Sequence, residues 1–213
     1  MQKNISTNWN KLLPEFYLRT NVVTIAKDLL GKVLVTQFDG ILTAGRIAET
    51  EAYNGAIDKA SHAFGNRRTK RTEIMFSTGG CAYVYLCYGI HHLFNVVTNA
   101  QNIPHAVLIR AVEPVIGIET MLLRTNKIKF DHSITKGPGN VSKALGISTR
   151  LTGISLLSDE LYIADDDYKI NKNNIIATTR IGVEYSGDDA LLPYRFIIKN
   201  NLFVSGKKNH SKK

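Results

Sequence analysis

The sequence predicts a single compact α+β domain built on a curved, mainly antiparallel β-sheet with flanking helices. A length of 213 residues suits one domain with a substantial core. Strand-like segments outnumber helical ones, and hairpins outnumber strand–helix–strand crossovers, which favours antiparallel pairing. The chain has no internal repeat, low-complexity tract or Pro/Ser-rich linker. We expect loosely attached ends at residues 1–15 and 207–213 around a folded domain of residues 16–206.

The first elements of the domain are expected to be a helix and a hairpin. An amphipathic pattern at 23–30 predicts a helix that ends at Gly31 and is followed by a strand from Lys32. The "FDG" turn at 38–40 predicts a hairpin that returns into a second strand at 41–53. These two strands are therefore expected to pair.

A polar loop at 54–72 and an aromatic hairpin follow. The alternating stretch "CAYVYLCYGIHHLFNVVTN" breaks at Tyr88-Gly89, which predicts two strands joined there by a turn. Downstream we expect four more strands and two helices. The strands are expected at 106–112, around Tyr162, at 175–183 and at 194–199, and the helices at about 115–123 and just after Pro138.

The charge balance favours a polyanionic partner, most often nucleic acid. Lys and Arg total 27 against 18 acidic residues, which gives a formal net charge of +9. A basic protein without such a partner is the alternative. The loop segment "NRRTKRT" contains four of the basic residues, Arg67, Arg68, Lys70 and Arg71. The basic tail "GKKNHSKK" is equally well explained as a solvated end.

Two cysteines and the absence of an apolar leader favour a cytoplasmic location. Cys81 and Cys87 argue against a disulfide framework, and their spacing does not match common zinc pairs. No apolar run approaches the roughly 18 residues of a membrane span. Phosphate-binding glycine motifs and the zinc-deaminase signature are also missing. We therefore predict neither a cofactor nor a metal.

The stretch "RIAETEAYNG" places two glutamates two residues apart on a predicted strand. Glu49, Glu51 and Tyr53 share one face of an ideal strand, because side chains alternate with period two. Burying an unpaired carboxylate is costly. Either this is an exposed edge strand with solvated carboxylates, or at least one acid is held there for a purpose. A bulge at Thr50 that turns the two glutamates apart is a further possibility.

The aromatic hairpin carries tyrosines suited to stacking. Tyr83 and Tyr85 share a strand face, and Tyr88 falls at the turn, where little core is available to pack against. Ordinary half-buried strand residues are the alternative. A basic loop, a projecting aromatic and a partly buried glutamate together favour an enzyme that acts on a base extruded from a duplex. The carboxylate would activate a water molecule that attacks the sugar.

Several motifs, taken in order, resemble the alkyladenine (3-methyladenine) DNA glycosylase family. They are "RIAETEAY", "ASHAFGNRRTKRT", "YVYLCYGIHHLFNVV", "AVLIRAVEP" and "KGPGNVSKALGI". The likeness covers residues 16–206, which would then be a glycosylase domain. It implies a hairpin that enters the minor groove, and excision of alkylated purines such as 3-methyladenine and 7-methylguanine. In some members hypoxanthine and ethenoadenine are also substrates.

The resemblance also implies roles for individual residues. Glu51 would be the base that activates water, and Arg110 would lie near that water and the DNA backbone. Tyr88 would intercalate into the duplex. The base pocket would comprise Tyr53, His62, Tyr85, Asn95 and Ile181, the last through its carbonyl oxygen. Apart from the resemblance, we expect the basic residues Arg67, Arg68, Lys70, Arg71 and Lys136 to contact the DNA backbone.

The resemblance and the lack of a lysine in a nucleophile motif imply a monofunctional enzyme without a lyase step. We expect it to act as a monomer on double-stranded DNA. A damage-sensing protein without catalysis and an RNA-binding protein are the alternatives. The chain departs from the family pattern at "NGAID", at Thr72 and at Gly79-Gly80, which replaces a common Pro-Gly turn.

Overall fold

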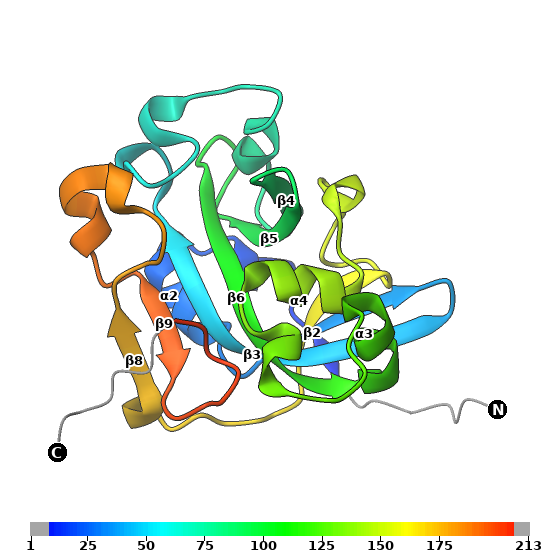
Figure 1. Cartoon of the computed structure of the whole chain (residues 1–213). Coiled ribbons are helices and arrows are strands. Elements are labelled where there is room, and N and C mark those ends of the chain that lie inside the picture. Colours follow the sequence, from blue (N-terminus) through cyan, green and yellow to red (C-terminus); the bar gives the residue numbers. More distant parts are fainter. Residues whose placement is uncertain (1–8, 207–213) are drawn as a thin grey trace, which may run out of the picture.

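Within residues 9–206, the part of the chain that this computed structural model describes, nine strands form one antiparallel sheet (Figure 1). The predicted α+β fold is confirmed. The strands are β1 (Asn10–Lys11), β2 (Val33–Phe38), β3 (Ile41–Tyr53), β4 (Ala82–Cys87), β5 (His91–Thr98), β6 (His105–Ile116), β7 (Leu161–Asp165), β8 (Ile175–Thr178) and β9 (Arg195–Ile198). The α-helices are α1 (Pro14–Tyr17), α2 (Val22–Asp28), α3 (Ile118–Thr125) and α4 (Pro138–Leu145). Short 3-10 helices include η1 (Gly55–Ile57), η2 (Phe64–Asn66), η3 (Glu73–Phe76) and η7 (Glu184–Leu191).

Strand β3 lies at the centre of the sheet, whose main order is β1-β7-β2-β3-β6-β5-β4. One edge of β3 pairs with β6. The other edge pairs first with β2, through residues 41–46, and then with β9, through residues 49–51. Both glutamates of "ETEAY" therefore lie on an interior strand with neighbours on both sides, and the exposed edge strand is excluded.

The turn between β2 and β3 has the geometry that the sequence predicts. Asp39 and Gly40 both have positive φ, 50° and 75°, as a two-residue type I′ hairpin turn requires. Strand β3 then covers 41–53, as expected. The preceding helix, α2, covers Val22–Asp28 rather than 23–30, and the predicted helix is confirmed within two residues at each end.

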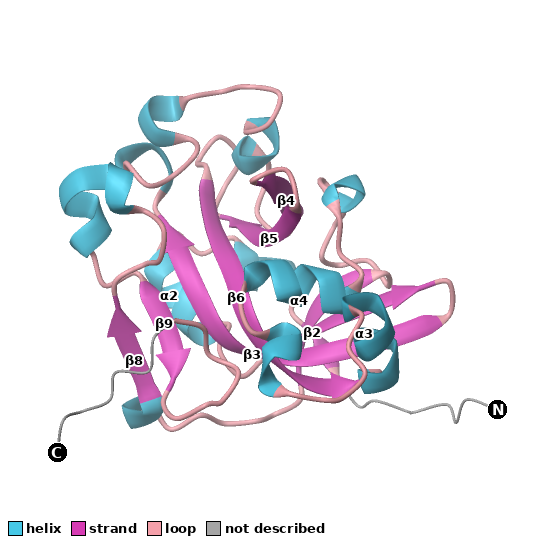
Figure 2. Ribbon diagram, viewed as in Figure 1, coloured by secondary structure: helices cyan, strands magenta, loops and turns pink. Residues whose placement is uncertain are grey.

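Helices pack on the sheet and close its core. In Figure 1, α2 lies behind β3, whereas α3 and α4 lie in front of the sheet, and Figure 2 shows the same layers by element type. Thr50 Oγ1 donates a hydrogen bond of 2.8 Å to the Ala26 carbonyl of α2. Pro138 occupies the first turn of α4, as predicted, and Gly146 ends that helix with a φ of 72°. Fully buried core side chains include Ile25, Phe94, Ile109 and Leu145.

Strand β6 is longer than predicted, so the helix that follows it begins later in the sequence. Its pairing with β3 continues as far as Ile116, which lies opposite Ala44. The turn is then made by Gly117, with a φ of 79°, and α3 begins at Ile118. The helix expected at about 115–123 therefore starts later, because the strand pairing holds Val115 and Ile116 in the sheet.

The prediction of a strand at 175–183 is wrong for its second half, because β8 ends at Thr178. The chain then leaves the sheet and turns at Gly182, where φ is 76°. Contacts with distant residues hold it there: the Ile181 amide donates to Glu51 at 2.9 Å. The apolar alternation of this segment carries no sign of that contact.

The N-terminal segment is described from residue 9 onward. Its β1 pairs with β7 through Asn10 and Asp165, and α1 begins at Pro14. The side chain of Tyr17 at the end of α1 is fully buried. Residues 9–15 are thus held against the domain. The predicted basic tail, 207–213, lies outside the described residues.

The base of the β4–β5 hairpin is anchored to α1 through Gly79. The Gly79 amide donates to the Asn99 carbonyl at 2.8 Å, and the Asn99 amide donates to the Tyr17 carbonyl at 2.7 Å. A Cβ atom on Gly79 would lie 2.6 Å from the Tyr17 oxygen and 2.9 Å from the Asn99 oxygen. Backbone atoms cannot give way as a flexible side chain does, so the close approach requires glycine here.

We predict that Gly79→Ala lowers the free energy of unfolding by about 1–3 kcal/mol, the usual cost of overpacking. The melting temperature should fall by about 2–4 °C for each kcal/mol in a chain of this size. Thermal denaturation followed by circular dichroism measures this change. Thr78→Ala, at the exposed neighbouring position, is the control. An unchanged melting temperature for Gly79→Ala would contradict the proposed anchoring.

Candidate active site

A cavity of about 420 Å³ opens between the β4–β5 hairpin, the start of α4 and the loops that follow β3 and β8. The five residues predicted for the base pocket all line it, as do Tyr88 and Arg110. The five are Tyr53, His62, Tyr85, Asn95 and Ile181. Side chains from four separate parts of the chain therefore converge as the sequence analysis expected.

Glu51 lies directly behind the wall of this cavity and has no exposed surface. Its Oε2 accepts hydrogen bonds from Tyr53 Oη at 2.9 Å and from Arg110 Nη1 at 3.2 Å. Its Oε1 accepts a hydrogen bond from the Ile181 amide at 2.9 Å. All three partners line the cavity, so Glu51 is linked to the cavity through them. The family resemblance implied a role for the Ile181 carbonyl, whereas the structure shows a contact through the Ile181 amide.

Burial raises the pKa of Glu51, and this outweighs the opposing effects of Arg110, the Ile181 amide and the Tyr53 hydroxyl. The negative charge of Glu49 raises it further. Burial also holds the pKa of Tyr53 well above its ordinary value, so this hydroxyl stays protonated and donates to Glu51. The result is a carboxylate that binds a proton more readily than an exposed glutamate does.

Glu49 is also fully buried, but it is surrounded by cations and donors. Burial alone would raise its pKa, yet the charges of Arg110 and Arg195 and the Ser205 amide outweigh burial and hold the pKa below its usual value. The pairing between β3 and β6 is irregular on both sides of Glu49. Both glutamates nevertheless contact Arg110, so this irregularity does not turn them apart.

Arg71 lies against the pocket rather than extending from its loop. Its guanidinium carbon is 4.8 Å from the centroid of the Tyr85 ring, and its Nη2 donates to His62 Nε2 at 3.2 Å. Since that nitrogen accepts, the His62 proton is on Nδ1, which donates to Tyr83 Oη at 2.8 Å. Burial, together with Arg71 and Arg67, lowers the pKa of His62 to about 4. His62 is therefore neutral near pH 7.

Asn95 is fixed by two carbonyl groups of its own hairpin. Its Nδ2 donates to the Tyr83 oxygen at 3.1 Å and to the Leu93 oxygen at 3.2 Å. Both amide hydrogens are thereby used, and Asn95 presents its Oδ1 as an acceptor at the cavity wall. The side chain is held rigidly at the position the sequence analysis gave it.

Tyr88 stands at the tip of the hairpin, with 89% of its surface exposed. It has a φ of 51°, and Gly89 beside it has a φ of 73°, so the two residues form the predicted turn. Ile90, which the sequence analysis did not single out, is 71% exposed next to them. The hairpin therefore presents an aromatic and an aliphatic side chain away from the core.

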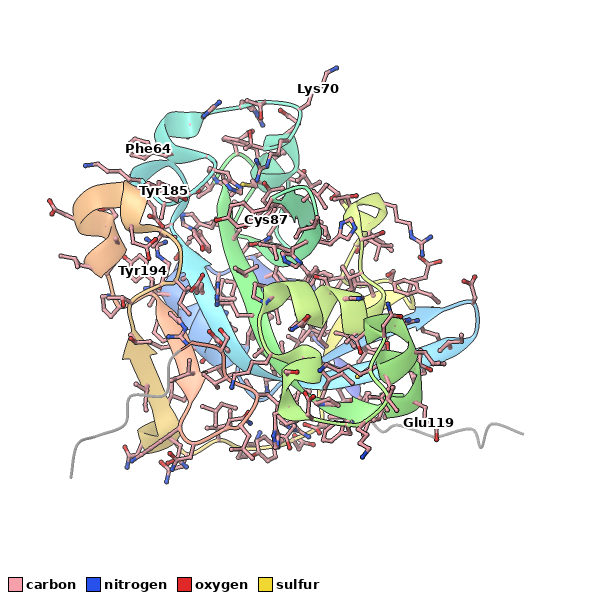
Figure 3. All side chains as sticks on the ribbon, in the orientation of Figure 1. Phe64, Lys70, Cys87, Glu119, Tyr185 and Tyr194 are labelled. Carbon is pink, nitrogen blue, oxygen red and sulfur yellow. The ribbon has the colours of Figure 1, made fainter. Side chains whose placement is uncertain are left out.

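The remaining loop cations differ in their surroundings. Lys70 projects away from the body of the molecule (Figure 3). Arg68 packs over the Phe76 ring at 4.3 Å and pairs with Glu73 at 3.2 Å. Arg67 is exposed, and Lys136 lines the cavity near α4, with its Nζ 3.5 Å from the Leu202 carbonyl oxygen. Of the five predicted cations, Lys136 lines the cavity, and the other four lie in the loop between η2 and η3, where Arg71 contacts the cavity-lining residues Tyr85 and His62.

The structure reveals a buried ion pair that sequence reasoning missed. Arg180 binds both carboxylate oxygens of Asp58, at 2.5 and 2.9 Å, and its guanidinium carbon lies 4.9 Å from the Tyr53 ring centroid. The pair joins the loop after β3 to the loop after β8, where Tyr185 Oη also donates to the Ala60 carbonyl. Asp58 and Arg180 are far apart in sequence, so no local pattern connects them.

Across the described part of the chain, no three His, Cys, Asp or Glu side chains gather in a way that could hold a metal ion. Cys81 and Cys87 are free thiols, and burial raises the pKa of Cys81 to about 11. No helix within residues 9–206 is long and apolar enough to cross a membrane.

A buried carboxylate behind an aromatic cavity, beside a projecting hairpin, is suited to cleaving the glycosidic bond of an extruded base. Comparison with known proteins identifies the class as DNA glycosylases, hydrolases that act on N-glycosyl bonds. A sequence profile described as methylpurine-DNA glycosylase (MPG) matches residues 15–202, and the chain belongs to that family.

Similar proteins from several bacteria carry the name "putative 3-methyladenine DNA glycosylase". One from Chlamydia felis is 47% identical over 189 residues, which cover 88% of this chain and 96% of the relative. One from Bacillus mycoides is 46% identical over 200 residues, which cover 90% and 98%. One from Clostridium perfringens is 42% identical over 201 residues, which cover 91% and 98%. The similarity therefore extends over nearly the full length of both partners.

We predict that Arg71→Gln raises the pKa of His62 above its value of about 4, because a nearby cation is removed. The pKa is measured by following the imidazole Cε1–H resonance of His62 by NMR during a pH titration. Lys70→Gln removes a neighbouring charge that does not contact His62 and is the matched control. If the His62 titration is the same in Arg71→Gln as in the unmodified protein, Arg71 does not control this imidazole.

Proposed function

We propose that this protein is a monofunctional DNA glycosylase that rotates alkylated purines out of duplex DNA and hydrolyses their N-glycosidic bond. The substrates are 3-methyladenine and 7-methylguanine, and the product is an abasic site. The observation that carries the proposal is the Glu51 carboxylate, which is bound to three residues that line an aromatic cavity. Family membership and the names of the relatives support the substrate class.

The cavity is suited to a flat, positively charged base. Tyr53 and Tyr85 supply aromatic surface, and ring faces attract cations such as an N-methylated purine. His62 is neutral near pH 7, which avoids a further positive charge beside such a base. Neutral lesions such as hypoxanthine and ethenoadenine would need protonation to leave. Their excision is therefore expected over a narrower pH range.

In the proposed reaction Glu51 accepts a proton from water while the water oxygen bonds to C1′ of the sugar. The bond between C1′ and the purine nitrogen breaks through an oxocarbenium-like transition state, and its electron pair leaves with the purine. A cationic purine becomes neutral as it departs, so no acid is required. The raised pKa of Glu51 favours this proton transfer, and Arg110 remains charged beside it.

Water, rather than an amine, is the proposed nucleophile. Lys136 lines the cavity, but its Nζ lies 3.5 Å from the Leu202 carbonyl oxygen, and no contact places it near Glu51. A lyase step would require an amine that bonds to C1′. Borohydride should therefore trap no covalent complex between this protein and damaged DNA, whereas a trapped complex would contradict the monofunctional assignment.

The hairpin and the basic loop would hold the DNA. Tyr88 is the proposed intercalating side chain, which occupies the space left by the extruded nucleotide, with Ile90 next to it. Arg67 and Lys70 are exposed and are proposed to neutralise phosphates. We propose that the protein acts as a monomer.

We predict that Glu51→Gln lowers the rate of 7-methylguanine release by about 10²–10⁴-fold, because a general base is lost. Binding to the same damaged duplex should persist. Single-turnover base release, followed by alkaline cleavage of the abasic product, measures the rate, and a gel-shift assay measures binding. Glu113→Gln, which changes an exposed glutamate on β6, should leave both unchanged. Full activity of Glu51→Gln would contradict the mechanism.

We predict that Tyr88→Ala weakens binding to a damaged duplex by about 1–3 kcal/mol, the usual contribution of one stacked aromatic. Its melting temperature should stay the same, because the side chain is 89% exposed. Fluorescence anisotropy measures the affinity. Ile128→Ala, at a side chain that is 97% exposed on another part of the surface, is the control. Equal affinity of Tyr88→Ala and the unmodified protein would exclude intercalation by this residue.

A further inference from the structure

We propose that Glu49 is a positioning residue for the proposed hydrolysis. It holds the Arg110 guanidinium between two carboxylates and prevents Arg110 from pairing with Glu51 alone. The inference rests on the role proposed above for Glu51. Glu49 has no exposed surface and does not line the cavity, so it does not touch the substrate itself.

The Glu49 carboxylate accepts four hydrogen bonds from protein groups. Its Oε1 accepts from Arg110 Nε at 3.0 Å, Arg195 Nε at 2.7 Å and Ser205 Oγ at 2.8 Å. Its Oε2 accepts from the Ser205 amide at 2.6 Å. Four donors on three separate segments, β6, β9 and the chain after β9, fix this carboxylate in one orientation. It is therefore a rigid anchor for Arg110.

The anchor determines how Arg110 meets Glu51. An arginine beside one carboxylate usually forms two parallel hydrogen bonds with it. Here Nε is engaged by Glu49 at 3.0 Å, and only Nη1 reaches Glu51, at 3.2 Å. Glu51 is thus held by one arginine hydrogen bond rather than two. Its other oxygen is bound by the Ile181 amide.

The charged groups around Glu51 determine whether the loss of Glu49 makes the Glu51 carboxylate a stronger or a weaker base. On β3, Glu51 faces Glu49 and Tyr53. From other elements it is approached by Arg110 of β6, Tyr85 of β4, Arg195 of the paired strand β9, and Arg180 and Tyr185 of the loop after β8. The formal charges of two glutamates are balanced by Arg110 and Arg195. Without the charge of Glu49, the surroundings of Glu51 become more positive and its carboxylate becomes a weaker base.

The chain after β9 shields this anchor. Ser205 supplies two of the four hydrogen bonds to Glu49, and its carbonyl accepts from Arg195 Nη2 at 2.6 Å. Arg195 is therefore bound on both sides. This arrangement keeps the pair of Glu49 and Arg110 in a low-dielectric environment, where the charge of Glu49 acts strongly on Glu51.

The test is the pH dependence of single-turnover release of 7-methylguanine. In Glu49→Gln the acid limb of the rate profile should move to lower pH, because Glu51 is protonated less readily. The rate on the plateau should fall by about 10–100-fold, because Arg110 loses its anchor.

Two further variants separate charge from geometry. Glu49→Asp keeps the charge but shortens the side chain, so its rate should fall while its acid limb stays near that of the unmodified protein. Ser205→Ala keeps the amide hydrogen bond and the charge, so its acid limb should not move.

Circular dichroism establishes which variants are folded. If Glu49→Gln does not fold, Arg195→Gln is the second variant, and its acid limb should move to higher pH because a cation is removed. A lower rate with an unmoved acid limb in the folded variant would show a merely structural role and overturn the proposal, as would an unchanged profile. Full activity of Glu51→Gln is a different outcome, because it contradicts the role of Glu51 itself.

Discussion

The structure depends on a buried network of charges in which Arg110 bridges Glu49 and Glu51. Taking charged groups out of water costs several kcal/mol for each, and this cost is offset only where partners are close and well oriented. Here the partners come from β3, β6 and β9, with Ser205 completing the set. The glutamates can be interior only because three strands meet around them. Glu51, the proposed catalytic carboxylate, is therefore held by the same strands that form the centre of the fold.

Around this rigid centre, the cavity is completed by loops that are tied to it individually. Asp58 and Arg180 join the loops after β3 and β8, and Arg180 also packs against the Tyr53 ring. Because the Ile181 amide binds Glu51, the position of that loop is linked to the position of the carboxylate. The walls of the cavity and Glu51, the proposed general base, are thus held by the same contacts. In contrast, the tip of the β4–β5 hairpin exposes Tyr88 and Ile90, as the proposed insertion into DNA would require.

The arrangement also separates the roles of similar residues. Two buried glutamates on one strand have opposite pKa shifts. Each accepts a hydrogen bond from a backbone amide, but Glu49 is paired with two arginines, whereas Glu51 shares only one of them and burial prevails there. Likewise, Arg71 belongs to the same basic stretch as Lys70, yet it packs on Tyr85 while Lys70 extends outward. Residue type alone does not assign these roles. The electrostatic surroundings of each side chain determine its role.

Local sequence patterns were sufficient for much of the fold, whereas most members of the candidate site came from the resemblance to a known family. Alternation and the Asp39-Gly40 turn predicted β3, and the tyrosine pattern predicted the hairpin with Tyr88 at its turn, because both depend on neighbouring residues. The motifs also identified the residues that line the cavity. The segment after β8, the start of α3, the ion pair of Asp58 with Arg180 and the role of Glu49 depended on partners far away in the chain. In "RIAETEAYNG" the sequence alone determined that two acids share a strand, and only the tertiary structure decided which cations and amides each would meet.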